Sequence, residues 1–292
     1  MRKSIDFPKR IKKIDESVID NIVSIALHED LLTVGDLTTK SLLEKEKRLV
    51  KAFVFSKEFG MVCGIDFFKK SFLKIDENVD IIIYKKDGEE VNKGENIAEI
   101  NGNAFSLLTA ERTALNFLGF LSGIATKVNF YTKLIKSSPT KILDTRKTLP
   151  GLRVLEKYAV ATGGGFNHRY GLYDMILIKE NHIYSVGSIK EAVKRAKDFN
   201  PNEIVEVEIQ NLNQIEEVLN TGAEIVMLDN MNNDQIKKAF QLLKDTKFVE
   251  VSGNVNKERL VELADIGVDF VSMGELTHTI KPLDISMIIK EA

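Results

Sequence analysis

Polar residues that could do chemistry follow six short apolar runs in the second half of the chain. The runs are KILDTRK (141–147), DMILIKENH (174–182), EIVEVEIQN (203–211), EIVMLDN (224–230), FVEVSGN (248–254) and DFVSMGE (269–275). Their polar or glycine ends are Arg146, Lys147, Lys179, Glu208, Asp229, Ser252 and Gly274. Lysine and arginine bind anionic groups, and paired carboxylates bind Mg²⁺. The set therefore predicts an anionic, phosphorylated substrate and assistance by a metal ion.

The densest concentration of positive charge lies between residues 144 and 174. This segment reads DTRKTLPGLRVLEKYAVATGGGFNHRYGLYD and contains Arg146, Lys147, Arg153, Lys157, His168 and Arg169. Guanidinium groups match planar carboxylates and phosphates with two parallel N–H bonds. So many cations directly after a buried strand would repel one another unless an anion lay among them. The alternative is a solvated surface loop.

Three roles are open for Lys179, which follows the apolar run MILI. A desolvated lysine can form a Schiff base, a charged one can bind phosphate, and one at the rim of a barrel can have no role. The neighbouring Asn181 and His182 favour a function.

The acids and small residues at the later strand ends suggest where phosphate and metal would bind. Glu208 and Asp229 end successive strands, so their carboxylates could face each other and hold Mg²⁺ or ribose hydroxyls. Glu206 points the same way as Glu208, deeper in the fold, and is an alternative working acid. Ordinary capping of strand ends is the other interpretation. The turns SGN (252–254) and MGE (273–275) follow the last two strands, where barrels commonly bind phosphate.

The elements that position these residues alternate between strand and helix. Five of the six apolar runs are separated by stretches with helical spacing, which is typical of a parallel sheet or barrel whose ligands bind at the carboxyl ends of the strands. A complete eight-stranded barrel needs ~250 residues, and the series spans only 141–275. The pattern allows an open or incomplete barrel, or a doubly wound sheet.

The first half of the chain mixes helices with strands that we expect to be antiparallel. Helical spacing covers 16–29, strands are expected over 47–63, and IIIYKKDGEEV predicts a hairpin that turns at Asp87-Gly88. Apolar residues recur at three and four positions from 106 to 135, which predicts two helices hinged near Ser122-Gly123. The tail KPLDISMII has a strand-like pattern.

Bulk composition excludes several classes of protein. The 292 residues carry a net charge of −2, which argues against a nucleic-acid-binding surface. No apolar run approaches the ~20 residues that span a bilayer. The basic start, MRKSIDFPKRIKKID, lacks the apolar core of a secretory signal, and we expect a solvated arm. The single Cys63 indicates a reducing compartment, so a cytoplasmic location is expected. His28, His278 and Cys63 lack zinc-site spacing.

Several motifs together resemble the quinolinate phosphoribosyltransferase family. They are TRKTLPGLRVLEKYAV, GGGFNHRYGLYDMILIKENH, VEVEIQNL, VMLDN, EVSGNVN and GVDFVSMGELTH, preceded by EDLLTVGDLTT and ERTALNFLGFLSGIAT. The resemblance covers nearly the whole chain in order. It implies an α/β fold with an N-terminal α/β sandwich domain (1–115) and an open six-stranded α/β, TIM-like barrel (116–279). The tail, 280–292, is expected to return to the first domain.

The resemblance also implies an activity, a cofactor and partners. Phosphoribosyl pyrophosphate and quinolinate would give nicotinate mononucleotide, pyrophosphate and CO₂, with Mg²⁺, in de novo NAD biosynthesis. The protein would be a homodimer or higher homo-oligomer, with no nucleic-acid or membrane partner.

Roles for individual residues follow from the same resemblance. Two quinolinate carboxylates would be bound by Arg146, His168 and Arg169, with Arg112 of a neighbouring subunit completing the site. Pyrophosphate and substrate would meet Lys147 and Lys179, while ribose hydroxyls and Mg²⁺ would be held by Glu208 and Asp229. The 5′-phosphate would lie among Ser252, Gly253, Asn254 and Gly274.

Two residues depart from the family's usual pattern, because its SGG turn is SGN here and its GAL is GEL. Asn254 tolerates unusual φ, whereas Glu275 would repel phosphate unless it points away. Three alternatives remain: a related enzyme acting on another pyridine or pyrimidine acid, a Schiff-base aldolase centred on Lys179, and a non-catalytic binding or regulatory protein.

Overall fold

The computed structural model describes residues 2, 4–46 and 48–290, which divide into two compact units. Of these described residues, the barrel unit takes those within 1–10, 130–153 and 165–278, and the sheet unit takes those within 11–129, 154–164 and 279–290. This division differs from the expected one at 115/116, because each unit takes segments that are distant in sequence.

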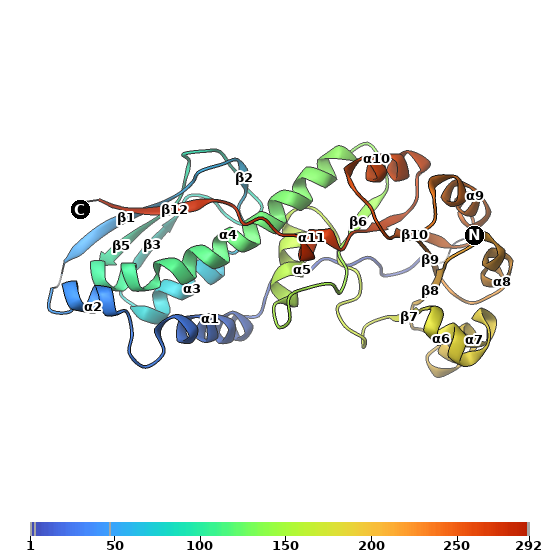
Figure 1. The fold of residues 1–292 in the computed structure, drawn as a ribbon, viewed down its shortest axis with the longest axis horizontal. Helices are drawn as coiled ribbons and strands as arrows, with labels where there is room; N and C mark the ends of the chain where they lie inside the picture. The colour runs from blue at the N-terminus through green and yellow to red at the C-terminus, as the bar shows by residue number, and fades with distance from the viewer. Residues whose placement is uncertain (1, 3, 47, 291–292) are drawn as a thin grey trace. The chain divides into compact units, whose positions relative to one another are not determined.

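The sheet unit is built on a four-stranded antiparallel sheet in the order β12-β1-β5-β3 (Figure 1). Its strands are β1 (Leu49–Ser56), β3 (Asp80–Ile83), β5 (Asn96–Asn103) and β12 (Ile285–Lys290). Its helices include α1 (Glu16–Leu31), α2 (Leu37–Leu43) and α3 (Ile65–Ile75). The C-terminal tail returns as β12, which pairs with β1 over six residue pairs. Buried side chains such as Phe68, Phe72 and Ile100 form the core of this unit.

The hairpin predicted around Asp87-Gly88 is wrong. Strand β3 pairs with β5, while β4 (Glu90–Val91) pairs with β2 (Gly60–Met61). The Asp87 carboxylate instead accepts a hydrogen bond from Ile65 N at 3.0 Å, at the start of α3, and another from the Tyr158 hydroxyl at 2.8 Å. The turn at Asp87-Gly88 does form, with Glu89 N donating to Lys86 O at 3.1 Å, but its two flanking strands pair with other partners, and the Asp87 side chain caps α3.

A single helix, α4 (Ala104–Leu134), replaces the two predicted helices. The glycines in it serve close packing rather than a hinge. A Cβ atom on Gly123 would lie 2.3 Å from the Lys281 carbonyl oxygen, and Leu283 N donates to Gly119 O at 2.9 Å. The tail leading to β12 thus packs directly on the helix backbone, which only glycine permits.

The barrel unit contains six parallel strands in the order β6-β11-β10-β9-β8-β7 (Figure 1). The strands are β6 (Lys141–Leu143), β7 (Ile176–Ile178), β8 (Val205–Ile209), β9 (Ile225–Asp229), β10 (Phe248–Ser252) and β11 (Phe270–Ser272). This is the cyclic order of a barrel, in which β6 pairs with β11 and β7 with β8, and within the described residues β6 and β7 do not pair with each other. The open six-stranded barrel is therefore confirmed over the doubly wound sheet.

Short helices join the barrel strands and begin at well-defined caps. Ser188, Asn232 and Asn256 each accept a backbone N–H at the start of α7, α9 and α10. The helices of the barrel unit after β7 are α6 (Glu180–Val186), α7 (Ile189–Phe199), η1 (Leu212–Gln214), α8 (Ile215–Leu219), α9 (Asn233–Leu243), α10 (Lys257–Ile266) and α11 (Glu275–His278). Between β6 and β7 in sequence lies α5 (Arg153–Thr162), nearly all of which belongs to the sheet unit. Within the described ranges, none of the chain's helices combines the length and hydropathy needed to cross a bilayer.

The prediction of a solvated N-terminal arm is also wrong. The Phe7 ring packs edge-on against His168, with centroids 5.4 Å apart, and against Phe270 at 5.3 Å. Lys9 forms a backbone bridge with Asn167, and Arg2 makes an ion pair with Asp269. An open barrel has interior apolar surface that its own strands leave uncovered, and the few apolar residues of the arm cover part of it.

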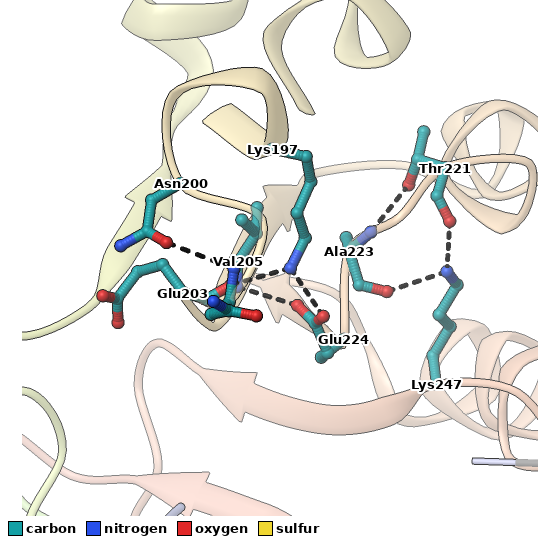
Figure 2. A network of polar contacts seen from close by, with 9 residues as sticks. Lys197, Asn200, Glu203, Val205, Thr221, Ala223, Glu224 and Lys247 are labelled. Carbon is teal, nitrogen blue, oxygen red and sulfur yellow. Dashed lines mark hydrogen bonds and ion pairs between the residues drawn. The ribbon is translucent and has the colours of Figure 1, made fainter. Parts of the chain in front are cut away.

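Lysines join the amino ends of the central barrel strands (Figure 2). Lys197 Nζ lies 2.6 Å from the Glu224 carboxylate, ahead of β9. Lys247 Nζ, ahead of β10, donates to the Thr221 and Ala223 carbonyls at 2.7 and 2.8 Å. The polar groups at this end form hydrogen bonds and ion pairs with one another. This is typical of the end of an α/β barrel whose residues contribute to stability and not to ligand binding.

Candidate active site

A cavity of about 870 Å³ opens at the carboxyl ends of the barrel strands. All seven of the predicted strand-end residues line it: Arg146, Lys147, Lys179, Glu208, Asp229, Ser252 and Gly274. The walls also include His168, Arg169, Gly253 and Asn254. Arg112 is exposed on α4 of the other unit and is not among the described residues that line this cavity.

A buried carboxylate holds the backbone segment that leads into Arg169. Asp144 is fully buried and accepts hydrogen bonds from Asn167 Nδ2 at 2.7 Å and His168 N at 2.9 Å. Arg169 Nη1 donates to Met175 O at 3.2 Å. Burial, and then the positive charge of Arg146, lower the pKa of Arg169. A bound anion would relieve both effects, because it would replace lost solvation and separate the two cations.

The acids of the cavity repel each other unless a cation lies between them. Glu208, with 9% of its side chain exposed, makes an ion pair with Lys179 Nζ. Burial, and then the charge of Glu208, raise the pKa of Asp229. Two carboxylates with this relation form an oxygen donor set that fits Mg²⁺.

Of the two turns expected to bind phosphate, the one at 252–254 has a left-handed backbone. Gly253 and Asn254 adopt φ of 93° and 50°, in the left-handed region. Turns of this kind form concavities of backbone N–H groups that bind anions. A Cβ atom on Gly274 would lie 3.0 Å from Lys147 Cδ, so glycine leaves room for that lysine. The Asn254 departure is accommodated in a left-handed backbone, at φ 50°.

The second departure, Glu275, has a partner within the barrel unit. The Tyr131 hydroxyl donates a hydrogen bond to the Glu275 carboxylate. Burial, and then this carboxylate, raise the pKa of the Tyr131 hydroxyl, which keeps the phenol protonated as a donor. Glu275 lines the cavity, and its carboxylate accepts the Tyr131 hydrogen bond there.

Comparisons with known proteins agree over both units. The model of the quinolinate phosphoribosyl transferase C-terminal domain matches residues 124–288, and that of the N-terminal domain matches 36–122. A Bacillus subtilis protein named probable nicotinate-nucleotide pyrophosphorylase (carboxylating) is 44% identical over 260 residues, covering 89% of each chain. The Arabidopsis thaliana nicotinate-nucleotide pyrophosphorylase (carboxylating) is 40% identical, covering 91% of this chain and 81% of its own.

Solved structures give the same result. The nicotinate-nucleotide pyrophosphorylase from Francisella tularensis superposes with a TM-score of 0.93 at 42% identity, covering 97% of this chain and 100% of its own. The chain belongs to the quinolinate phosphoribosyl transferase family. Within this family member, the cavity described above lies in the segment matched by the C-terminal domain model.

The polar residues that line the cavity of this family member but were missed by sequence reasoning include Asn230, Glu250 and His278. His278 was considered only as a zinc ligand. Its signal was its position four residues after Gly274, which places it one turn along the short helix α11. Glu250 lies two residues before Ser252 on β10 and so points the same way.

The alternative acid Glu206 belongs to a buried group under the cavity. His168 Nε2 lies 3.0 Å from the Glu206 carboxylate and 3.5 Å from that of Glu250. His168 Nδ1 accepts from Arg169 N at 2.7 Å. The ligand atoms of His168, Glu206 and Glu250 lie within 4.8 Å of one another, a spacing that a metal ion could bridge. Among the described residues, Glu208 lines the cavity and Glu206 does not.

The pH dependence of stability should report on the buried carboxyls. Burial, and then the neighbouring Glu206, raise the pKa of Glu250 from its usual 4.5 to about 8. This acid therefore contributes stability that is fully present below pH 4.5 and is lost as the pH rises through about 8. Glu250→Gln cannot ionise, so its Tm relative to the unsubstituted protein should rise between pH 5 and pH 8.5, by about 2–4 °C per kcal/mol relieved. Calorimetry of both proteins across this range is the measurement. A difference in Tm that does not change with pH would contradict the assignment.

Proposed function

We propose that this chain transfers the phosphoribosyl group of phosphoribosyl pyrophosphate to quinolinate, giving nicotinate mononucleotide, pyrophosphate and CO₂ in de novo NAD biosynthesis. Family membership supports the reaction. The observation that carries it is one cavity in which two arginines, two lysines, the strand-end acids Glu208 and Asp229, and two left-handed or glycine turns meet. The cations match the anionic groups of the two substrates, and the two acids match ribose hydroxyls and a metal ion.

Arg146 and Arg169 are the residues we assign to the quinolinate carboxylates. Their guanidinium groups can each bind a carboxylate with two N–H bonds. His168 Nδ1 accepts a hydrogen bond from Arg169 N, and its Nε2 lies beside the Glu206 carboxylate. His168 would therefore share its Nε2 proton between Glu206 and a substrate carboxylate, or hold Arg169 in place.

The remaining residues serve the phosphoribosyl donor. Lys147 and Lys179 would bind the pyrophosphate, on which negative charge builds as it leaves. Glu208 and Asp229 would hold ribose hydroxyls and Mg²⁺, which when bound neutralises charge on the leaving group. The same carboxylates favour positive charge on the ribose as it becomes oxocarbenium-like. The turns at 252–254 and 274 would bind the 5′-phosphate through backbone N–H groups.

The chemistry needs no electron sink from the protein. The pyridine nitrogen attacks the anomeric carbon while the bond to pyrophosphate breaks, and the ring becomes cationic. The bond between C2 and its carboxylate then breaks, and the electron pair left on C2 is stabilised by the adjacent ring cation until a proton is added. Fixed charges around the cavity orient the substrates for both steps.

We also propose a homodimer or higher homo-oligomer in which Arg112 completes a neighbour's site. Arg112 is exposed, and α1, α2 and the loop between them expose large apolar side chains, including Leu32, Leu37 and Leu42 at 66–70%. Apolar side chains exposed in this density are typical of an interface. A reducing, cytoplasmic location is proposed on the single cysteine, Cys63, which is buried and free.

One assay tests the function directly. The purified protein is incubated with quinolinate, phosphoribosyl pyrophosphate and Mg²⁺, and nicotinate mononucleotide and CO₂ are measured. Formation of both supports the proposal, and absence of both in folded protein refutes it.

Borohydride trapping tests the Schiff-base alternative. Lys179 is 48% exposed and ion-paired, which does not suit an uncharged amine nucleophile.

Nicotinate should be a very poor substrate. It lacks the carboxylate at the 2-position, so either the exposed Arg146 or the half-buried Arg169 would be left without its anion. Sites built to pair a charged group penalise its loss by roughly 10⁴-fold or more. Comparing kcat/KM for quinolinate and nicotinate measures this selectivity. Efficient use of nicotinate would favour a different phosphoribosyltransferase.

Substituting the acids should separate donor binding from acceptor binding. Asp229→Asn and Glu208→Gln keep the shape of each side chain but remove its charge, so the Mg²⁺-dependent affinity for phosphoribosyl pyrophosphate should fall about tenfold or more. Quinolinate affinity should stay close to that of the unsubstituted protein. Calorimetric titrations with and without Mg²⁺ measure both. Unchanged metal dependence in both variants would show that Glu208 and Asp229 serve only the structure, or that Glu206 is the metal ligand.

A further inference from the structure

Arg259 ties together two loops at the carboxyl end of the barrel. It lies in the first turn of α10, after the loop that follows β10. Its Nη1 donates to the Gly253 and Asn254 carbonyls at 3.1 and 3.5 Å, and its Nη2 donates to the Met231 carbonyl at 2.6 Å. All three acceptors are backbone carbonyls, and they belong to the loops after β9 and β10. One guanidinium fork therefore sets the relative position of both loops.

A second tie joins the same loops on the side of the cavity. Asn230 Nδ2 donates to the Asp229 carboxylate at 2.8 Å, and Asn230 Oδ1 accepts from Asn254 Nδ2 at 3.5 Å. Asn230 N also donates to Ser252 O at 3.2 Å. A Cβ atom on Gly253 would lie 2.3 Å from Asn230 Oδ1, so the Asn230 side chain packs directly on the backbone of the turn. The turn is thus connected to the acid of the neighbouring strand.

The direction of the carbonyls matters for an anion. In a trans peptide the C=O of one residue and the N–H of the next point in opposite directions. When Arg259 holds the Gly253 and Asn254 carbonyls, the N–H groups of Asn254 and Val255 are turned away from Arg259. Gly253, Asn254 and Val255 line the cavity, whereas Arg259 is not among the described residues that do. The arginine thus acts on the loop and not on the ligand.

We propose that Arg259 is a positioning residue that presets the 252–255 turn to receive the terminal phosphate of a ribose 5-phosphate group, with Asn230 linking that turn to Asp229. This inference rests on the proposed function, because it names the subsite for one end of the donor. Without the fork, the two carbonyls would be free to turn toward the phosphate and repel it. The phosphate would then have to order the turn as it binds, which weakens binding.

Three ligands separate this subsite from its neighbours. Ribose 5-phosphate probes the turn, inorganic pyrophosphate with Mg²⁺ probes the lysines and acids, and quinolinate probes the arginines. Arg259→Lys keeps the charge but cannot reach three carbonyls at once, and Arg259→Gln removes the charge as well. Both variants should bind ribose 5-phosphate roughly tenfold more weakly by calorimetry, the effect of losing one or two hydrogen bonds. Pyrophosphate and quinolinate should each bind within about twofold of the unsubstituted protein.

The matched control is Arg195→Lys, since Arg195 is an exposed helical arginine that contacts Glu191 at 2.7 Å. It should leave all three affinities unchanged. Arg259→Lys with unaltered ribose 5-phosphate affinity would overturn the inference. Equal weakening of all three ligands would also overturn it, because that result marks a general structural role. The unsubstituted protein could make no nicotinate mononucleotide while the Arg259 variants still weaken only ribose 5-phosphate binding. That result would refute the proposed function and support the role of Arg259 in positioning the 252–255 turn.

Discussion

Arg146→Ala should reduce kcat/KM for quinolinate by roughly two to four orders of magnitude. Arg146 and the half-buried Arg169 lie close enough that the charge of Arg146 lowers the pKa of Arg169. A dicarboxylate between them would be partly shielded from water. Removing one partner of a buried charge pair costs on the order of 3–5 kcal/mol, because the other charge is left uncompensated. Initial rates at varied quinolinate and saturating phosphoribosyl pyrophosphate measure the effect.

The control for this prediction is an arginine of similar exposure outside the cavity. Arg195→Ala removes a solvent-exposed cation of α7 and should change kcat/KM by less than twofold. Unaltered Tm in both variants would show that the fold is retained. Near-normal turnover by Arg146→Ala would remove Arg146 from the site and would return the cationic segment to the alternative of a solvated loop.

Arg112→Ala and Lys179→Ala should each be nearly inactive as homodimers, yet mixing them should restore activity. Lys179 lines the cavity of its own barrel, while Arg112 is proposed to reach a neighbour's cavity. A hybrid dimer then has one site with both lesions and one site with neither. Random pairing of equal amounts makes half of the dimers hybrid, so roughly a quarter of the original activity should return if the interface is isologous. Co-expression with two different affinity tags allows the hybrid to be purified and assayed.

The decisive control is a hybrid of each variant with itself under both tags, which should stay inactive. A purified Arg112→Ala/Lys179→Ala hybrid as inactive as its parents would mean that Arg112 does not act across subunits. A monomeric protein in solution that retains full activity would contradict the shared site altogether. These outcomes are distinct from a failure of the reaction itself, which the direct assay of the unsubstituted protein measures.

The prediction of the cavity from sequence succeeded because parallel βα units leave little freedom. Strands that follow one another in this pattern must place their carboxyl ends on one side, so residues such as Lys179, Glu208 and Asp229 converge whatever the loop details. The same logic missed Glu250, which lies two residues before Ser252 on β10 and points to the same side of the strand. His278 was missed because its role depends on a one-turn helix that local patterning does not predict.

The amino-acid sequence alone determined the alternation of strands and helices, the six-stranded count and the identity of the residues at the strand ends, because these depend on local periodicity. Only the tertiary structure decided the fate of segments whose partners are distant in sequence. Phe7 is buried against His168 and Phe270, Gly123 lies against Lys281 O, and β3 pairs with β5 instead of β4. In each case the segment packs against apolar surface, or bonds with backbone groups, from a distant part of the chain. A local sequence pattern does not show which distant segment will provide that partner.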